Sequence, residues 1–103
     1  MEASDTSVHL ELDARKFMSQ IERWSPAGLP FKVCMQNTLF LMTLWNEGTS
    51  LIRELAVEFE CSPHSVLRWA NGTETPHFTL QRRIVASLHR ELDLALSPAS
   101  AAS

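Results

Sequence analysis

Residues able to bind metals or carry out acid–base and nucleophilic chemistry are few and scattered in this sequence. The chain has four histidines and two cysteines, and only Cys61 and His64 stand at the spacing of a metal-ligand pair. A zinc site needs a second pair nearby, so we expect neither a metal nor another cofactor. The common catalytic patterns GxSxG, Walker, HExxH and GxGxxG do not occur. We therefore predict that the protein is not an enzyme.

Side chains suited to recognition gather in residues 62–68. Ser62 followed by Pro63 is typical of a helix start, because the hydroxyl caps the helix and proline fits its first position. Val66 and Trp69, three residues apart, would then pack inward on one face. The other residues of this stretch must point elsewhere: Pro63, His64, Ser65, Leu67 and Arg68.

A second short helix is predicted just before this one. Thr49 or Ser50 would cap it, and Leu51, Leu55 and Phe59 share one face. The helical pattern of apolar residues breaks after Phe59 and resumes with the helix that starts at Ser62 and Pro63. Two short helices across a tight turn, with a polar outer face on the second, make a helix-turn-helix.

The elements on the N-terminal side have to position this pair. Residues 31–45 are densely apolar and predict a buried helix that ends before Gly48, and residues 25–30 (SPAGLP) form a connector. Residues 8–13 alternate between apolar and polar types, as in a strand. Apolar residues also recur every three or four positions from Leu10 to Trp24, however, and this spacing favours a helix from at least Asp13. The apolar stripe formed by these residues packs either within the chain or against a second subunit. In the second case its residues would form the dimer interface. These are Leu10, Phe17, Ile21 and Trp24.

Length and composition limit the organisation of the chain. Its 103 residues, 45% of them hydrophobic, suffice for one core. We divide it into an N-terminal segment (1–28), a helix-turn-helix domain (29–96) and a disordered tail (97–103) without large apolar residues. The formal charge of −3 excludes a polybasic nucleic-acid binder. Unpaired cysteines and the lack of a membrane-spanning run predict a soluble cytoplasmic protein.

The run LAVEFECSPHSVLRWANGTETP resembles the lambda-repressor-like (Cro, or XRE) helix-turn-helix family. The family pattern is roughly LAxxLGVSxxTVSxWxxGxxxP, and the resemblance extends over residues 31–92. It implies an all-α, five-helix lambda-repressor-like domain, here with an extra N-terminal helical segment. It also implies that the third helix enters the DNA major groove and that dimers bind half-sites about one helical turn apart. The matching positions are Leu55, Ala56, Phe59, Cys61, Ser62, Val66, Trp69, Gly72 and Pro76.

The resemblance assigns DNA-contacting roles to individual residues. Arg68 would donate two hydrogen bonds to guanine, His64 and Ser65 would contact base edges, and Leu67 would touch a thymine methyl, with Pro63 shaping the approach. Other residues would contact phosphates and so position the protein without reading sequence. These are Thr49, Ser50, Arg53, Asn71, Thr73, Arg82 and Arg83.

Two positions depart from the family pattern, and the local charge is balanced. Glu60 replaces the turn glycine, which predicts either a strained left-handed residue or a different turn. Ile52 replaces a polar residue that contacts phosphate in many relatives. Residues 48–83 hold four arginines and four glutamates, so one copy should bind DNA weakly.

Two functions follow as expectations. The first is a sequence-specific transcriptional regulator, repressor-like, that binds double-stranded DNA as a homodimer on a palindromic operator. The second is a protein-protein interaction module or antitoxin-like adaptor on the same scaffold, with a protein partner such as a cognate toxin. The acidic balance and the scarcity of lysine favour the second.

Overall fold

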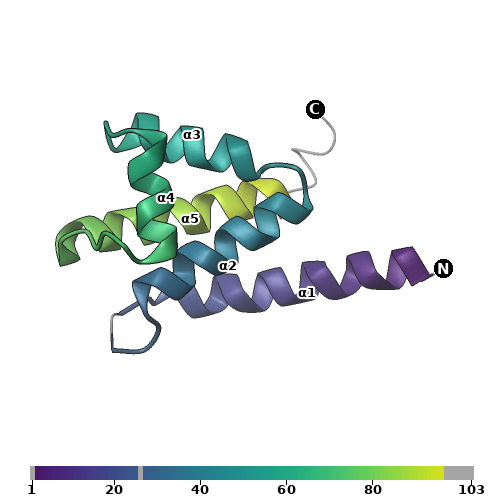
Figure 1. Cartoon of the computed structure of the whole chain (residues 1–103). Helices are drawn as coiled ribbons and strands as arrows, with labels where there is room; N and C mark the ends of the chain where they lie inside the picture. Colours follow the sequence, from purple (N-terminus) through teal and green to yellow (C-terminus); the bar gives the residue numbers. More distant parts are fainter. Residues whose placement is uncertain (1, 26, 97–103) are drawn as a thin grey trace.

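The computed structural model consists of α-helices and connecting turns over the residues that it describes (Figure 1). It describes the backbone of residues 2–25 and 27–96 and the side chains of residues 12–25 and 27–96. The predicted tail, 97–103, lies outside this part of the chain. The all-α class is confirmed, and no described helix is long and apolar enough to cross a membrane. The helices are α1 (Glu2–Glu22), α2 (Phe31–Leu44), α3 (Gly48–Glu58), α4 (Pro63–Asn71) and α5 (Phe78–Leu96).

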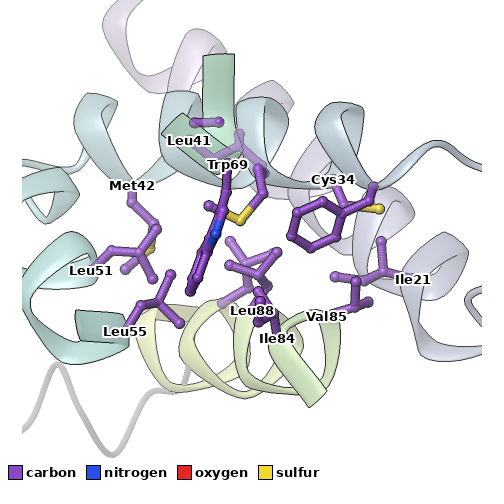
Figure 2. Close-up of a cluster of buried hydrophobic side chains, with 14 of the residues drawn as sticks. Ile21, Cys34, Leu41, Met42, Leu51, Leu55, Trp69, Ile84, Val85 and Leu88 are labelled. Carbon is purple, nitrogen blue, oxygen red and sulfur yellow. The ribbon is translucent and has the colours of Figure 1, made fainter. Parts of the chain in front are cut away.

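Helix α2 lies at the centre and contacts each of the other four helices. Helices α3 and α4 pack on one another and on α2, while α1 runs alongside α5 (Figure 1). Apolar side chains from all five helices meet in one core, shown in Figure 2. Among its most deeply buried members are Met35, Leu51, Leu55, Val66, Ile84, Val85, Leu88 and Leu92.

The N-terminal helix belongs to this core, which corrects the expected organisation. Residues 29–96 form four helices rather than five, and α1 is the fifth rather than an addition to a complete domain. The alternating residues 8–13 are helical, as favoured. Ala14, Phe17, Met18 and Ile21 are buried inside the chain, so the predicted N-terminal segment (1–28) shares one core with residues 29–96.

The packing of α1 places two of the candidate dimerisation residues in the core of the single chain. Phe17 and Ile21 are buried within the chain, because their stripe covers the apolar face of α5, and they are not free to pair with a second subunit. Trp24 is half-buried, stacks on Phe78 at 6.3 Å between ring centroids, and donates from Nε1 to the Leu29 carbonyl (2.8 Å). The side chain of Leu10 lies outside the described ones.

The α2–α3 junction differs in detail from expectation. Helix α2 is not buried all round, since Phe40 is 62% and Leu44 46% exposed on its outer face. Helix α3 begins at Gly48, one residue before the predicted caps, with Glu47 as N-cap and no side-chain cap bond. Gly48 also lies close against the end of α2, where a Cβ would lie 2.5 Å from Thr43 Oγ1.

A carboxylate ties α3 to α5. Glu58 Oε2 accepts from Ser87 Oγ and Oε1 accepts from Arg90 Nη2, both at 2.6 Å. Burial acts to raise the pKa of Glu58, but these hydrogen bonds and the charges of Arg90 and Arg83 outweigh it and hold that pKa below its usual value. The buried Ser87 hydroxyl is thereby satisfied.

The turn between α3 and α4 is strained at one residue. Glu60 has φ = 51°, the left-handed conformation that glycine adopts easily and other residues do not. The Cys61 N–H donates to the Ala56 carbonyl at 2.9 Å and closes the turn. The sequence left open either a strained left-handed residue or a different turn. The structure has the strained left-handed residue, Glu60.

Replacing Glu60 by glycine should stabilise the protein. We expect the free energy of unfolding in urea to rise by about 1 kcal/mol, because the Cβ strain exceeds the added entropy of the unfolded chain. The control is Glu60→Ala, which removes the same charge but keeps the Cβ and should gain much less. Equal gains for the two variants would show that charge, and not backbone strain, is responsible.

Candidate nucleic-acid interface

Helix α4 begins where its sequence predicts. Ser62 is its N-cap, with the hydroxyl accepting from the Ser65 N–H at 3.3 Å, and Pro63 occupies the first turn. Gly72 ends the helix in the left-handed conformation (φ = 83°), and its N–H donates to the Arg68 carbonyl at 3.0 Å. The local sequence therefore fixes both ends of this nine-residue helix.

The two faces of α4 differ sharply. Val66 and Trp69 are buried in the core, as predicted. The ring of Trp69 meets Phe59 of α3 edge-on at 6.3 Å between centroids, which holds α4 against α3. Four of the five predicted outward residues are exposed, namely Pro63, His64, Leu67 and Arg68. The fifth, Ser65, is half-buried, and its hydroxyl lies 3.3 Å from that of Ser62.

The side chain of Arg68 is exposed and forms an ion pair with Glu74. Its Nη1 lies 3.4 Å from Glu74 Oε1, and Glu74 Oε2 accepts from Trp69 Nε1 at 3.2 Å. A carboxylate from the turn after α4 thus sits beside the best candidate base-reading side chain. The sequence reasoning counted Glu74 only in the charge balance and missed this contact.

The predicted phosphate contacts after α4 are partly engaged with each other. Asn71 Oδ1 accepts from both the N–H (3.0 Å) and the hydroxyl (2.7 Å) of Thr73. These bonds give the turn a defined shape, as Asx-type turns do. They also occupy the amide oxygen of Asn71.

The side chains of Arg82 and Arg83 point to different parts of the surface. Arg83 lies over the ring of Phe59 (5.5 Å to the centroid), on the side of α3. Arg82 lies over Phe78 (5.1 Å) and lines a hollow between α1 and α5 with Ile21 and other residues. Neighbouring residues on a helix point about 100° apart, so only Arg83 lies near the α3–α4 pair.

Of the predicted contact residues in α3, Arg53 is the one that lies beside α4, whereas Thr49 lines a separate hollow with Leu39 and Thr43 of α2. Thr49, Ser50 and Arg53 are all exposed. Arg53 shares a shallow hollow with Pro63, the first residue of α4, and with Glu60. One cation and one carboxylate therefore flank the beginning of α4.

Lys32 is a cation that the sequence reasoning did not assign to this surface. It lies in the first turn of α2, and its side chain crosses the turn that ends α4. A Cβ on Gly72 would lie 2.9 Å from Lys32 Cδ and 3.3 Å from Nζ. No local pattern signals this contact, because the two residues are far apart in sequence. The ammonium also suits the negative end of the α4 dipole.

The two cysteines show no sign of reactive chemistry. Burial raises the pKa of the Cys34 thiol to about 11, with hydrogen bonds opposing only part of the shift. Burial, followed by the charge of Glu74, raises the pKa of Cys61. Both stay protonated at neutral pH and are poor nucleophiles. Cys61 and His64 belong to no group of three or more metal-ligating side chains among the described residues.

The surface around α4 therefore combines exposed recognition side chains with a small excess of positive charge. Lys32, Arg53, Arg68 and Arg83 contribute positive charge, and Glu60 and Glu74 oppose part of it. Comparison of the chain with protein-family models, with curated proteins and with solved structures returned no match.

Proposed function

We propose that this protein binds double-stranded DNA sequence-specifically through α4, as a homodimer on a palindromic operator, and regulates transcription in the manner of a repressor. One observation carries the proposal. Helix α4 is anchored through Val66 and Trp69 while His64, Leu67 and Arg68 remain exposed on its other side. A short helix held this way after a tight turn has the form of a recognition helix.

The dimensions and chemistry of α4 suit the major groove. Nine residues make a helix of about 13 Å, comparable with a groove about 12 Å wide. The Arg68 guanidinium matches the O6 and N7 acceptors of guanine, and His64 can donate to or accept from a base edge. Leu67, which is 40% exposed, offers a methyl contact to thymine.

Phosphate contacts would come from both ends of this surface. Lys32 is held at the C-terminal turn of α4, and Arg53 at the beginning of the helix. Arg83, stacked on Phe59, adds a third cation on the α3 side. Three or four phosphate contacts per subunit give a dimer slope of roughly −6 in log K against log salt, so affinity depends on dimerisation. The reading helices of the dimer would lie about 34 Å apart.

A second candidate is a protein-binding module, such as an antitoxin-like adaptor. The exposed pair Phe40 and Leu44, one turn apart on the outer face of α2, favours this reading, as does the formal charge of −3. Selection from a random pool of duplex DNA at low salt separates the two candidates. Enrichment of a palindromic sequence supports the regulator, and no enrichment refutes it.

Replacing Arg68 by alanine tests the base reader within the selected sequence. We expect the variant to lose about 1–3 kcal/mol of discrimination at one base pair of each half-site and little at the others. Binding titrations on a set of single-substitution duplexes measure this. The matched control is Arg23→Ala, a residue exposed just beyond α1. Full discrimination in the Arg68 variant would show that another residue reads that position.

A further inference from the structure

The turn that follows α4 delivers a carboxylate to the guanidinium of Arg68. The N–H groups of Gly72, Thr73 and Glu74 all point to the Arg68 carbonyl, at 3.0, 3.1 and 3.3 Å. The chain therefore wraps around the end of α4. This wrapping places Glu74 Oε1 3.4 Å from Arg68 Nη1.

Glu74 is held in place by more than its charge partner. Its second oxygen accepts from the indole N–H of Trp69 at 3.2 Å, and Trp69 is itself only 4% exposed. An ordinary surface ion pair is loosely held and contributes little. Here one partner is anchored to a buried ring, so the carboxylate remains beside Arg68 even when the guanidinium moves.

The fixed carboxylate affects two kinds of DNA contact differently. A phosphate brought to Arg68 would be repelled by the nearby negative charge of Glu74. The O6 and N7 acceptors of guanine carry no formal charge, so this repulsion is much weaker for them. Arginine has five N–H donors, so it can keep one on Glu74 and still offer two to a guanine edge.

From this arrangement we propose that Glu74 is a specificity-determining residue: it makes Arg68 a poor phosphate ligand while leaving it able to read guanine. The proposal rests on the proposed DNA-binding function. It gives this carboxylate a role, since a negative charge beside the reading side chain lowers binding to random DNA more than binding to the operator.

The test is Glu74→Gln in the full chain. Glutamine keeps an oxygen for the Trp69 indole but removes the charge. We expect affinity for random-sequence duplex DNA to rise about three- to tenfold at low salt. The slope of log K against log salt for random DNA should steepen by roughly 0.9 for each Arg68 that gains a phosphate. Affinity for the selected sequence should change less, so that the ratio between the two falls.

Two further variants separate charge at this site from charge in general. Asp93→Asn removes one negative charge from an exposed position near the end of α5 and should raise random-DNA affinity far less. Glu74→Asp keeps the charge and should remain within about twofold of the unmodified protein. A far-UV circular dichroism spectrum of each variant verifies that it is folded.

The outcomes distinguish this inference from the function on which it rests. If the unmodified protein prefers one sequence and Glu74→Gln behaves as Asp93→Asn does, Glu74 has no role in specificity and only this inference fails. A Glu74→Gln variant whose discrimination is unchanged leads to the same conclusion. If neither the unmodified protein nor the variants prefer any duplex, the DNA-binding function itself fails.

Discussion

Replacing Phe17 by alanine is expected to lower the free energy of unfolding by about 3–5 kcal/mol. Phe17 is 6% exposed in α1, in the stripe that packs on α5 and α2. The alanine leaves a cavity in addition to the lost burial of the ring. Because small domains are stable by only about 5–15 kcal/mol, this change removes much of the total. Urea denaturation followed by circular dichroism measures it.

Leu12 is the matched control for Phe17. It lies in the same helix but is 61% exposed, so Leu12→Ala should change the free energy of unfolding by no more than about 0.5 kcal/mol. Repeating both titrations over a hundredfold range of protein concentration tests the alternative assignment of the stripe. If the loss in Phe17→Ala shrank with dilution, Phe17 would stabilise an assembly rather than the single chain.

Replacing Trp69 by alanine should be equally damaging, for a different structural reason. Trp69 joins α4 to the core and stacks edge-on against Phe59 of α3. Its indole N–H also holds Glu74. We expect a loss of about 3–5 kcal/mol in the free energy of unfolding, measured in urea, together with loss of any sequence preference for DNA.

The neighbouring Leu67 provides the control in the same helix. It is 40% exposed, so Leu67→Ala should affect the free energy of unfolding far less than Trp69→Ala does. Under the proposed function it should instead weaken discrimination at a thymine position. A stable Trp69→Ala variant would mean that α4 is held by other contacts, and the account of how the reading face is oriented would be wrong.

The start of α4 was predicted from the sequence, and both of its ends follow from local chemistry. A serine cap, a proline in the first turn and a glycine in the left-handed conformation act within a few residues of one another. The strain at Glu60 was likewise one of two outcomes expected from a non-glycine residue in a turn. The N-cap of α3 was misplaced by two or three residues, because it is Glu47, whose side chain makes no cap bond, rather than Thr49 or Ser50.

The sequence by itself determined the short helix pair and the division of α4 into a buried and an exposed face, since each depends on residue spacing within one helix or turn. The all-α class came from the family resemblance. Only the tertiary structure decided that α1 completes the core, that Lys32 reaches Gly72, and that Arg83 rather than Arg82 lies over Phe59. Those facts depend on which helices pack together. Spacing along the chain shows that a face is apolar, but the identity of its partner is settled by the packing of the whole chain.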